Sequence, residues 1–586
     1  MRQWMVAAKK ADFYAIAEKF HVDPVVARII RNREVIGEKN IRIYLGGNLS
    51  DLSDPHQMKD MDRLVEILAQ KIRKQVHIRI IGDYDVDGVT SSHLFLTALR
   101  RVGAKVDVVI PHRIQDGYGL SLHLLQQAKE DGVDTILTCD NGIAAIDEIA
   151  WAKAQKMTVL VTDHHAVPFE EHEGRRTEKK SLADAVVNPH QQDCGYPYKE
   201  LCGAGVAWNV IRVLYENYDM DKREAEDLLD FVAMATVCDV MSLTGENRIL
   251  VKEGLKRISH TKNIGLQALM QACNVQPENI SAYHFGYVLG PCVNATGRLD
   301  TARHALRLFE TGQETEAEEI ARDLVDLNQE RKELTLQGVE MAKKLCEEGG
   351  YEKDPVLVLF LPDVHESIAG LIAGRIREMY NRPVFVLTRG EEGVKGSGRS
   401  TENYSMYENM CGCAELFTKF GGHPMAAGLS LPEENVEKFR RKINENCPLT
   451  VEEVCPDIHI DMAMPVGYAS TELVHQFALL EPFGKDNPSP LFADRNLSIS
   501  RMWLIGKNRN VLRMSVLSEY GQPVPVIFFG DVETLFAYFT EKFGQKEVEN
   551  ALHGRKNRIL FSMVYTAKID FYQGNENLQL EMKYYR

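Results

Sequence analysis

Short apolar runs alternate with helical patterns along the first third of the chain. The runs are His77–Ile81, Lys105–Ile110, Thr135–Thr138, Thr158–Val161 and Ala185–Asn188. Between them, apolar residues recur at helical spacing, as in the segment Val89–Val102. Strands that alternate with helices predict βαβ units around a mainly parallel sheet.

Polar residues follow several of these predicted strands. Three aspartates come after the first run, one after the third, and an Asp-His-His sequence after the fourth, while a further aspartate closes the apolar helical segment 231–239. The candidate catalytic residues are Asp83, Asp85, Asp87, Asp140, His164, His165 and Asp239. Because the carboxyl ends of parallel strands share one edge of a sheet, we expect these side chains to lie close together.

The aspartates after the first run alternate in sequence. If the strand continues through them, Asp83, Asp85 and Asp87 point to one side and repel one another unless a cation lies between them. The alternative is an acidic turn in which Asp87 caps the following helix. The polar residues at the other strand ends favour a metal site.

Carboxylates mixed with imidazoles suit Mn²⁺ or Mg²⁺. The large number of carboxylates predicts two ions that share a bridging aspartate. Such a pair of ions can activate a water for attack on a phosphate. The predicted ligands are Asp85, Asp87, Asp140, His164 and Asp239. Asp83 and His165 are expected beside them as a further ligand, a proton carrier or a phosphate contact, and Asp87 or Asp239 is a candidate for the bridge.

The rest of the chain changes pattern twice. Long amphipathic helical stretches between residues 302 and 349 predict a spacer, and a second α/β segment begins near Asp354. From about Cys455 onward, short alternating strands predict a small antiparallel barrel. The expected divisions are an N-terminal helical segment (1–75), a parallel-sheet domain (76–300), a helical connector (301–350), a smaller α/β domain (351–452) and a β-barrel (453–586). The fold class is therefore α/β multidomain.

Composition narrows the function only slightly. The chain has 586 residues, 44% of them hydrophobic, and a net charge of −15. This charge argues against a protein that coats nucleic acid electrostatically, but metal-binding carboxylates contribute to it, so a nuclease stays possible. No apolar run is long enough to span a membrane and no signal-peptide core is visible, so we expect a cytoplasmic protein.

Several motifs together resemble the DHH phosphoesterase superfamily. They are Asp83-Tyr-Asp85-Val-Asp87-Gly88, Asp140-Asn-Gly142, Asp163-His164-His165 and Asp239. Asp116-Gly-Tyr-Gly-Leu120 and Asn294-Ala-Thr-Gly-Arg298 are similar to the RecJ branch of that superfamily. The resemblance implies DHH, DHHA1 and OB-fold domains, and an exonuclease that degrades single-stranded DNA from the 5′ end in DNA repair and recombination.

Glycine-rich segments in the second α/β domain are candidates for phosphate contact. In Lys395-Gly-Ser-Gly-Arg-Ser400, backbone amides and a guanidinium could surround a phosphate, although a glycine hairpin is the alternative. With the resemblance, the expected substrate-binding residues are Asn294, Arg298, His365, Ser397, Gly398, Arg399, Ser400, Gly422 and His423.

The barrel strands carry cations beside an aromatic residue. The expected DNA-binding residues are Arg501, Trp503, Lys507, Arg509 and Arg513. Such a set can stack bases and follow phosphates, whereas the alternative is an ordinary solvated strand face.

Two other functions within the superfamily remain alternatives. One is a phosphodiesterase acting on nanoRNA or cyclic dinucleotides, and the other is a non-catalytic, Cdc45-like binding protein. Single-stranded DNA is the expected partner, and the resemblance implies a single-strand-binding protein and a RecQ-type helicase as further partners. We expect a monomer that does not associate with membranes.

Overall fold

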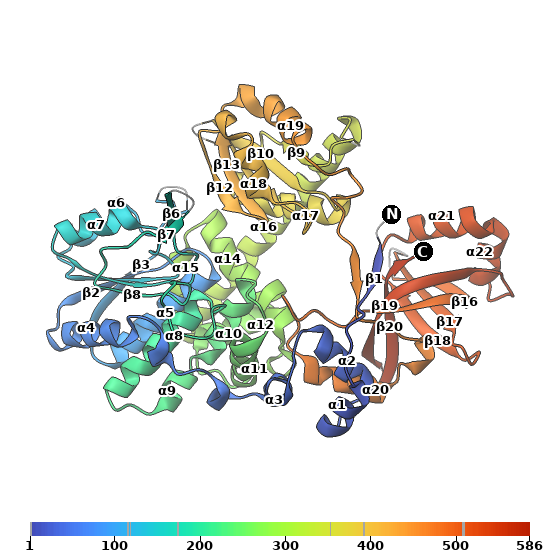
Figure 1. Ribbon diagram of the computed structural model, residues 1–586, viewed down its shortest axis with the longest axis horizontal. Helices are drawn as coiled ribbons and strands as arrows, with labels where there is room; N and C mark the ends of the chain where they lie inside the picture. Colours follow the sequence, from blue (N-terminus) through green and yellow to red (C-terminus); the bar gives the residue numbers. More distant parts are fainter. Residues whose placement is uncertain are drawn as a thin grey trace. The chain divides into compact units, whose positions relative to one another are not determined.

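The computed structural model describes residues 3–113, 116–117, 119–172, 175–351, 353–390, 393–506, 510–572 and 574–586. The chain divides into two compact units, which are treated separately below (Figure 1). The first contains Leu52–Met241 and Glu246–Pro456, and the second contains Gln3–Asp51, Ser242–Gly245 and Asp457–Arg586.

A parallel sheet of five strands opens the first unit. Its order is β3-β2-β4-β5-β8, and every neighbouring pair is parallel. The strands are β2 (His77–Ile81), β3 (Lys105–Val109), β4 (Thr135–Cys139), β5 (Thr158–Thr162) and β8 (Ala185–Val187). The prediction of βαβ units around a parallel sheet is therefore confirmed, because strands buried on both faces are readable as apolar runs.

Helices cover both faces of this sheet. Helices α6 (Leu122–Glu130) and α7 (Ile146–Ala154) share a buried core with sheet residues such as Ile136. Helices α5 (Val86–Arg101) and α8 (Gly203–Asn217) pack together and contact β4, and α4 (Met61–Arg73) packs on α8. A hairpin of β6 (Phe169–His172) and β7 (Arg175–Glu178) was not predicted.

The aspartate segment differs from expectation. Strand β2 ends at Ile81, and helix α5 begins at Val86, so the strand does not continue through the three aspartates. Asp85, not Asp87, is the N-cap, because its carboxylate accepts a hydrogen bond of 3.1 Å from the amide of Gly88. The prediction that strand alternation aligns these side chains was therefore wrong, and Asp87 lies in the first turn of the helix.

Helices dominate the middle of the first unit. They are α9 (Lys222–Glu226), α10 (Leu229–Cys238), α11 (Gly245–Ile258), α12 (Ile264–Ala272), α13 (Ala282–His284), the π-helical turn η4 (Phe285–Leu289), α14 (Gly290–Leu299), α15 (Ala302–Glu310) and α16 (Glu314–Glu348). Helix α16 packs against α12 and α14, and its Val339 and Ala342 enter the core of the next domain. The predicted spacer thus also supplies core residues.

A second sheet follows within the same unit. Its order is β12-β13-β11-β10-β9, in which β9 and β10 are parallel and the other pairs antiparallel. Its elements are β9 (Leu357–Phe360), α17 (Glu366–Tyr380), β10 (Val384–Gly390), β11 (Gly393–Arg399), α18 (Met406–Cys411), β12 (Lys419–His423), β13 (Ala426–Leu431) and α19 (Val436–Glu445). The predicted glycine-rich phosphate loop is strand β11.

A six-stranded sheet forms the core of the second unit. Its order is β15-β16-β17-β18-β20-β19, and pairing of β16 with β19 closes it into a barrel. The elements are β15 (Met462–Ala463), α20 (Thr471–Gln476), β16 (Phe492–Ile505), β17 (Val511–Leu517), β18 (Pro523–Phe528), α21 (Val532–Phe543), α22 (Gln545–Leu552), β19 (Leu560–Tyr572) and β20 (Asn575–Tyr585). The barrel is confirmed, but it is mixed, because β15–β16 and β18–β20 are parallel.

Residues near the N-terminus belong to this second unit. Strand β1 (Trp4–Val6) pairs with β14 (Ile458–Ile460) in a separate two-stranded sheet. The prediction that residues 458–460 form a strand of the barrel was therefore wrong. Helices α1 (Phe13–Phe20), α2 (Pro24–Asn32) and α3 (Glu38–Gly46) follow, and their buried residues join the barrel core. The segment expected as one piece up to residue 75 is thus shared between the two units.

Short 3₁₀ turns connect several elements: η1 (Leu49–Asp51), η2 (Pro55–Gln57), η3 (Pro277–Asn279), η5 (Ala414–Leu416), η6 (Glu433–Asn435), η7 (Val466–Tyr468) and η8 (Phe477–Leu480). Among the described residues, none of the helices is both long enough and apolar enough to cross a membrane.

Candidate metal centre and substrate cavity

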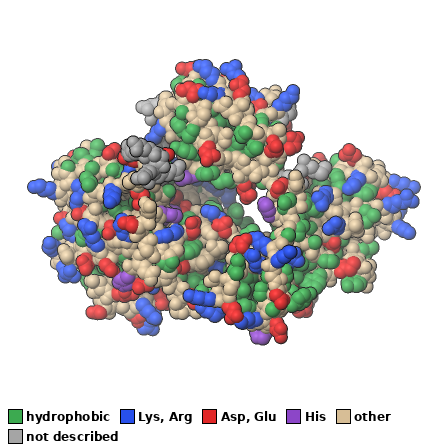
Figure 2. All heavy atoms as spheres, viewed as in Figure 1, with side chains coloured by type: hydrophobic (Ala, Val, Ile, Leu, Met, Phe, Trp, Pro, Cys, Tyr) green, Lys and Arg blue, Asp and Glu red, His purple; other side chains and the backbone are tan. Residues whose placement is uncertain are grey.

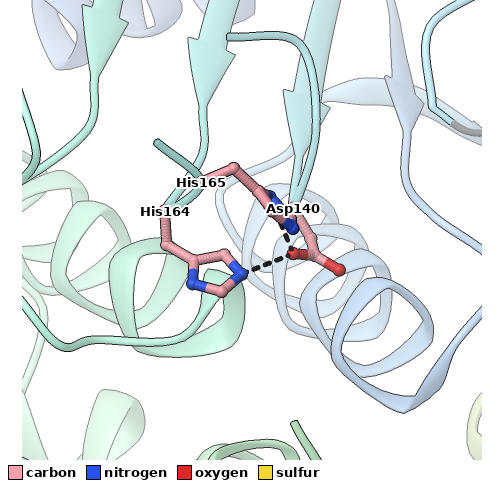
Figure 3. A group of neighbouring side chains, drawn as sticks. All are labelled: Asp140, His164 and His165. Carbon is pink, nitrogen blue, oxygen red and sulfur yellow. Dashed lines mark ion pairs between the residues drawn. The ribbon is translucent and has the colours of Figure 1, made fainter. Parts of the chain in front are cut away.

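The predicted catalytic residues meet at the carboxyl edge of the parallel sheet. Asp140 and His164 follow β4 and β5, and Asp239 is the C-cap of α10. The Nε2 atom of His164 lies 3.1 Å from Asp140 Oδ1, 3.6 Å from Asp87 Oδ2 and 3.6 Å from Asp239 Oδ2. Figure 3 shows that the rings of His164 and His165 approach the Asp140 carboxylate from two sides.

The ligand-type atoms fall into groups that could each hold a cation. Within a group, one atom from each residue lies within 4.8 Å of the others. The groups are Asp83 with Asp85 and Asp140, Asp87 with His164 and Asp239, and Asp140 with His164 and His165. The first two groups share no residue, and the third connects them through Asp140 and His164. This arrangement favours two neighbouring cation sites, and Asp87 or Asp239 as the bridging residue stays a prediction.

Two buried atoms of this cluster lack hydrogen-bond partners. Asp83 Oδ1 and His164 Nε2 are both inaccessible and make no hydrogen bond with a described residue, although His164 Nε2 has the Asp140 carboxylate as an ion-pair neighbour. Leaving such atoms unpaired costs roughly 1–3 kcal/mol each, so they fit a bound cation that they would coordinate. The donor set of carboxylate oxygens and imidazole nitrogen also matches Mn²⁺ or Mg²⁺.

Burial and mutual repulsion act on the carboxylates. Burial, followed by the charge of Asp85, raises the pKa of Asp83 well above its usual value. Burial and the charge of Asp87 likewise raise the pKa values of Asp85 and Asp140. Ionising these groups together is therefore unfavourable without a counter-charge, which a divalent cation would supply.

A strained turn presents Asp140. Its φ angle is 61°, in the left-handed region that Asp and Asn tolerate better than most residues. The Asn141 side chain holds this turn by donating to the carbonyl oxygens of Ile81 (3.0 Å) and Cys139 (2.9 Å). Gly142 follows with a φ of 107°. The Asp-Asn-Gly motif is thus the sequence this turn requires.

Asp163 positions the two histidines. Its carboxylate accepts from the amides of Ile143, His164 and His165 and from Nδ1 of His165 at 2.8 Å. Burial opposes its ionisation, but the hydrogen bond from His165 and the other donors outweigh burial and lower the pKa of Asp163. Burial also opposes protonation of His165, yet Asp163 prevails and raises the pKa of His165 to about 9. Asp163 is therefore a positioning residue.

The start of helix α8 is a feature that sequence reasoning missed. The amides of Gly203 and Ala204 donate to the Asp87 carboxylate at 2.6 Å and 2.7 Å, as expected where a helix N-terminus meets an anion. A Cβ atom on Gly203 would lie 2.6 Å from Asp140 Cβ. The available signal was the glycine-rich sequence Cys-Gly-Ala-Gly ahead of an apolar helical pattern.

A cavity of about 490 Å³ lies in the first unit and contains part of the predicted substrate-binding set. Its lining includes the cations Arg113, Arg298, Lys395, Arg399 and Lys419, together with Tyr84, Glu366 and Ser397. The face of the molecule in view in Figure 2 mixes Lys and Arg with Asp and Glu. Positive charge is therefore concentrated around this cavity, although the chain as a whole has a net charge of −15.

Two arginines anchor this cavity. Arg298 donates to the carbonyl oxygen of Ser367 at 2.7 Å, and burial lowers the pKa of Arg298 to about 10. Arg399 donates to the Gly398 carbonyl at 2.8 Å, and burial lowers its pKa as well. Half-buried guanidinium groups without a carboxylate partner suit an anionic ligand.

The other expected substrate contacts lie outside the cavity lining. Asn294 accepts a hydrogen bond from the amide of Val86, so it supports the start of α5. Ser400 is buried and donates to the Tyr404 carbonyl, and a Cβ on Gly398 would meet Met406 and Phe385. His365 caps α17, and Gly422 and His423 are exposed at the end of β12.

In the barrel, three expected DNA-binding residues share one face. Trp503 pairs with Arg513 across β16 and β17, and the guanidinium carbons of Arg501 and Arg513 lie 5.7 Å and 5.9 Å from the Trp503 ring. Lys507 and Arg509 lie outside the described residues.

The structure has the parts of a multidomain protein of the DHH class. These are a parallel sheet with carboxylates and histidines at its carboxyl edge, a second sheet with a basic cavity, and a closed barrel. Family models match each part: the DHH family N-terminal domain over residues 77–236, the DHHA1 domain over 353–447 and the RecJ OB domain over 460–584. The chain belongs to the RecJ family, as the resemblance implied.

Similar proteins cover most of the chain. A curated protein of Haemophilus influenzae, "Single-stranded-DNA-specific exonuclease RecJ", is 32% identical over 96% of this chain and 96% of its own length. The Bacillus subtilis protein of the same name is 32% identical over 87% of this chain, but the match spans 63% of that longer relative. The crystal structure of RecJ in complex with Mn²⁺ from Thermus thermophilus matches with a TM-score of 0.81 and 25% identity, covering 100% of this chain and 79% of that one.

Proposed function

We propose that this protein is a metal-dependent exonuclease that degrades single-stranded DNA in the 5′→3′ direction. The observation that carries the proposal is the pair of disjoint ligand groups at the sheet edge, which a third group connects through Asp140 and His164. Relatives that cover nearly the whole chain are named as single-stranded-DNA-specific exonucleases, which supports this function over the nanoRNA, cyclic-dinucleotide and Cdc45-like alternatives.

Two cations of the Mn²⁺ or Mg²⁺ kind fit this site. One would be held by Asp83, Asp85 and Asp140, and the other by Asp87, His164 and Asp239. When bound, such ions supply Lewis-acid activation of a water and neutralise charge on a phosphodiester.

The protein's own residues prepare this chemistry. Asp163 fixes the His165 ring and keeps its imidazole protonated, so His165 can hold a proton beside Asp140 and donate to a phosphate oxygen. The α8 amides fix the Asp87 carboxylate, which leaves its remaining lone pairs for a cation. Each group is therefore positioned before substrate arrives.

The basic cavity is the proposed site for the DNA backbone. Arg298 and Arg399 are half-buried and lack carboxylate partners among the ion pairs of the described residues, so a phosphate can accept from them. In the second unit, Trp503 between Arg501 and Arg513 is the proposed base-stacking surface. A monomeric state, a cytoplasmic location, and a single-strand-binding protein and a RecQ-type helicase as partners remain predictions.

The test is degradation of long oligonucleotides labelled at the 5′ or 3′ end, with Mn²⁺ and with a chelator. We expect 5′-labelled strands to release labelled mononucleotides first, and 3′-labelled strands to shorten progressively. Duplex and RNA controls define the substrate range. Degradation from the 3′ end, or none of long strands, contradicts the proposal.

Asp140→Asn is the matched variant. Asparagine tolerates the positive φ of 61° at this position, so the turn should persist while the charge is lost. We expect cleavage to be abolished and single-stranded DNA to bind with nearly unchanged affinity. A wild-type cleavage rate in this variant would contradict the metal assignment.

A further inference from the structure

Two cysteine thiols lie close together in the helical middle of the first unit. Cys273 is the C-cap of α12, Cys292 lies near the start of α14, and their Sγ atoms are 3.8 Å apart. Both thiols are free, and no other two cysteines of the described residues form a hydrogen bond with each other. The function proposed above makes no use of this pair.

Helix α16 stabilises the thiolate form of Cys292. The Cys292 side chain is buried, and the side-chain amide of Asn328 donates to its Sγ atom at 3.3 Å. Arg331 in turn donates to the Asn328 oxygen at 2.8 Å. The hydrogen bond from Cys273, together with the groups of α16, outweighs burial and lowers the pKa of Cys292. A sulfur whose thiolate is stabilised in this way is a good nucleophile toward a neighbouring oxidised sulfur.

Cys273 gives the pair its access to solvent. Cys273 is half-buried, whereas Cys292 is buried behind it. A small oxidant therefore meets the Cys273 sulfur first. Disulfide sulfurs are about 2.05 Å apart, so these two sulfurs must approach each other by roughly 1.8 Å to form a bond.

We propose that Cys273 and Cys292 are an oxidation site, at which a peroxide closes a reversible disulfide between α12 and α14. The Cys273 sulfur attacks hydrogen peroxide, the O–O bond breaks, and the products are a sulfenic acid on Cys273 and one water. The Cys292 sulfur then attacks the sulfenic sulfur, and hydroxide leaves and takes up the Cys292 proton as a second water. Overall, the two thiols lose two electrons and two protons, and the peroxide is reduced to two waters. A dithiol reverses the oxidation by thiol–disulfide exchange.

Helix α14 connects this site to the metal centre. Asn294, two residues after Cys292, accepts from the Val86 amide at 3.1 Å, where α5 begins. A Cβ atom on Gly297 would lie 2.3 Å from the Tyr84 carbonyl oxygen, so α14 packs directly on the aspartate turn. A disulfide that draws the start of α14 toward α12 therefore shifts these contacts and lowers turnover. The effect on turnover rests on the proposed exonuclease function, whereas formation of the disulfide does not.

Peroxide treatment of the full chain in the presence of a chelator, followed by alkylation of the remaining thiols and peptide mapping, tests the site. We expect a cross-linked pair of peptides that contain Cys273 and Cys292, and dithiothreitol should separate them. Cys273→Ser should abolish this pair. Cys411→Ser is the matched control, because it replaces an exposed thiol that has no cysteine partner, and it should form the pair as the wild type does.

Turnover of 5′-labelled single strands is then measured with Mn²⁺, after catalase has removed the peroxide. Oxidation should lower the turnover of the wild type and of Cys411→Ser by about tenfold or more, because a displacement of roughly 1 Å near a catalytic centre can cost about a hundredfold. Dithiothreitol should restore the rate, and Cys273→Ser should keep its rate throughout.

Absence of the cross-linked pair in oxidised wild type overturns the oxidation site. An equal loss of turnover in Cys273→Ser, or a disulfide without loss of turnover, overturns the coupling through α14. A disulfide in a protein that degrades no single strands in either state supports the oxidation site and contradicts the proposed function. The mapping on wild type decides the site even if Cys273→Ser fails to fold.

Discussion

Gly203 is the residue whose replacement tests the metal centre most directly without removing a ligand. It stands at the start of α8, with its amide 2.6 Å from Asp87 Oδ2. A Cβ atom added here would lie 2.6 Å from Asp140 Cβ and 3.0 Å from its Cα and Cγ. Gly203→Ala therefore acts on residues from both proposed cation sites at once.

The size of the effect follows from these distances. Carbon atoms pack at about 3.5–4.0 Å, so either the α8 terminus or the Asp140 turn must move by roughly 1 Å. Overpacking of this kind typically costs about 1–3 kcal/mol of stability. A displacement of roughly 1 Å in a catalytic group can reduce the rate by about a hundredfold. We therefore expect a folded protein with a much lower turnover and weaker Mn²⁺ binding.

Gly205→Ala is the matched control on the same helical turn. A Cβ atom at Gly205 would lie 3.4 Å from the Leu201 side chain, which is an ordinary contact. Alanine is also favoured over glycine within a helix by roughly 0.5–1 kcal/mol. This variant should keep near wild-type turnover of 5′-labelled single strands, while Gly203→Ala loses most of it across the Mn²⁺ titration.

Two results would refute the reasoning. One is a Gly203→Ala variant with wild-type turnover and Mn²⁺ affinity, which would mean that the contact with Asp140 has no effect on the centre. The other is an equal loss in both variants, which would indicate a general defect of α8 and not a local collision.

Four further variants separate the roles of individual residues. Asp140→Asn should raise the unfolding midpoint of the chelated protein, since it removes a carboxylate whose ionisation burial and the charge of Asp87 disfavour. It should also reduce the further rise that Mn²⁺ gives the wild type, and a lower midpoint in chelator would contradict this. Asn294→Ala should raise the Mn²⁺ concentration needed for activity, because the Val86 amide at the start of α5 loses its hydrogen-bond acceptor. Arg298→Lys should instead raise the KM for DNA, because lysine lacks the forked donors of the guanidinium. Kinetics with varied metal and with varied oligonucleotide distinguish the two effects. Trp503→Ala should weaken binding of long single strands by about 1–3 kcal/mol in fluorescence titrations and leave hydrolysis of very short ones unchanged.

The parallel sheet was predictable because strands that are buried on both faces appear in the sequence as apolar runs. The run His77–Ile81 matches strand β2, and the residues that follow β4 and β5 met at one edge as expected. Topology alone therefore brings Asp140 and His164 together, whatever the details of the intervening loops.

The local geometry of the aspartates was not predictable in the same way. A Cβ atom on Gly88 would lie 2.4 Å from the Asp83 carbonyl oxygen, so the turn after β2 is tighter than a continued strand. The contact between Gly203 and Asp140 joins residues far apart in the sequence. Neither spacing nor propensity reports such a contact, because it exists only once α8 has packed against the sheet.

Glycines in β11 illustrate a different limit. A Cβ atom on Gly396 would lie 2.4 Å from a Leu387 methyl carbon, so close strand packing accounts for this glycine. Glycine in a sequence cannot by itself distinguish a phosphate loop from such an approach. By contrast, Leu578, Leu580 and Met582 alternate with polar residues in β20, a pattern that indicates a strand from the sequence alone.

The pairing of β1 with β14 has a consequence for the order in which the chain can fold. Val26 and Ile30, near the start of the chain, share a core with Met464 and Phe492. That core cannot form until the ribosome has synthesised the segments that precede and follow the first unit in the sequence. Early helices must therefore wait, partly exposed, while more than four hundred residues are synthesised between Asp51 and Asp457. A barrel fragment that starts at Asp457 would lack this part of its core. Expression of the second unit alone would require joining residues 3–51 to it through a new linker.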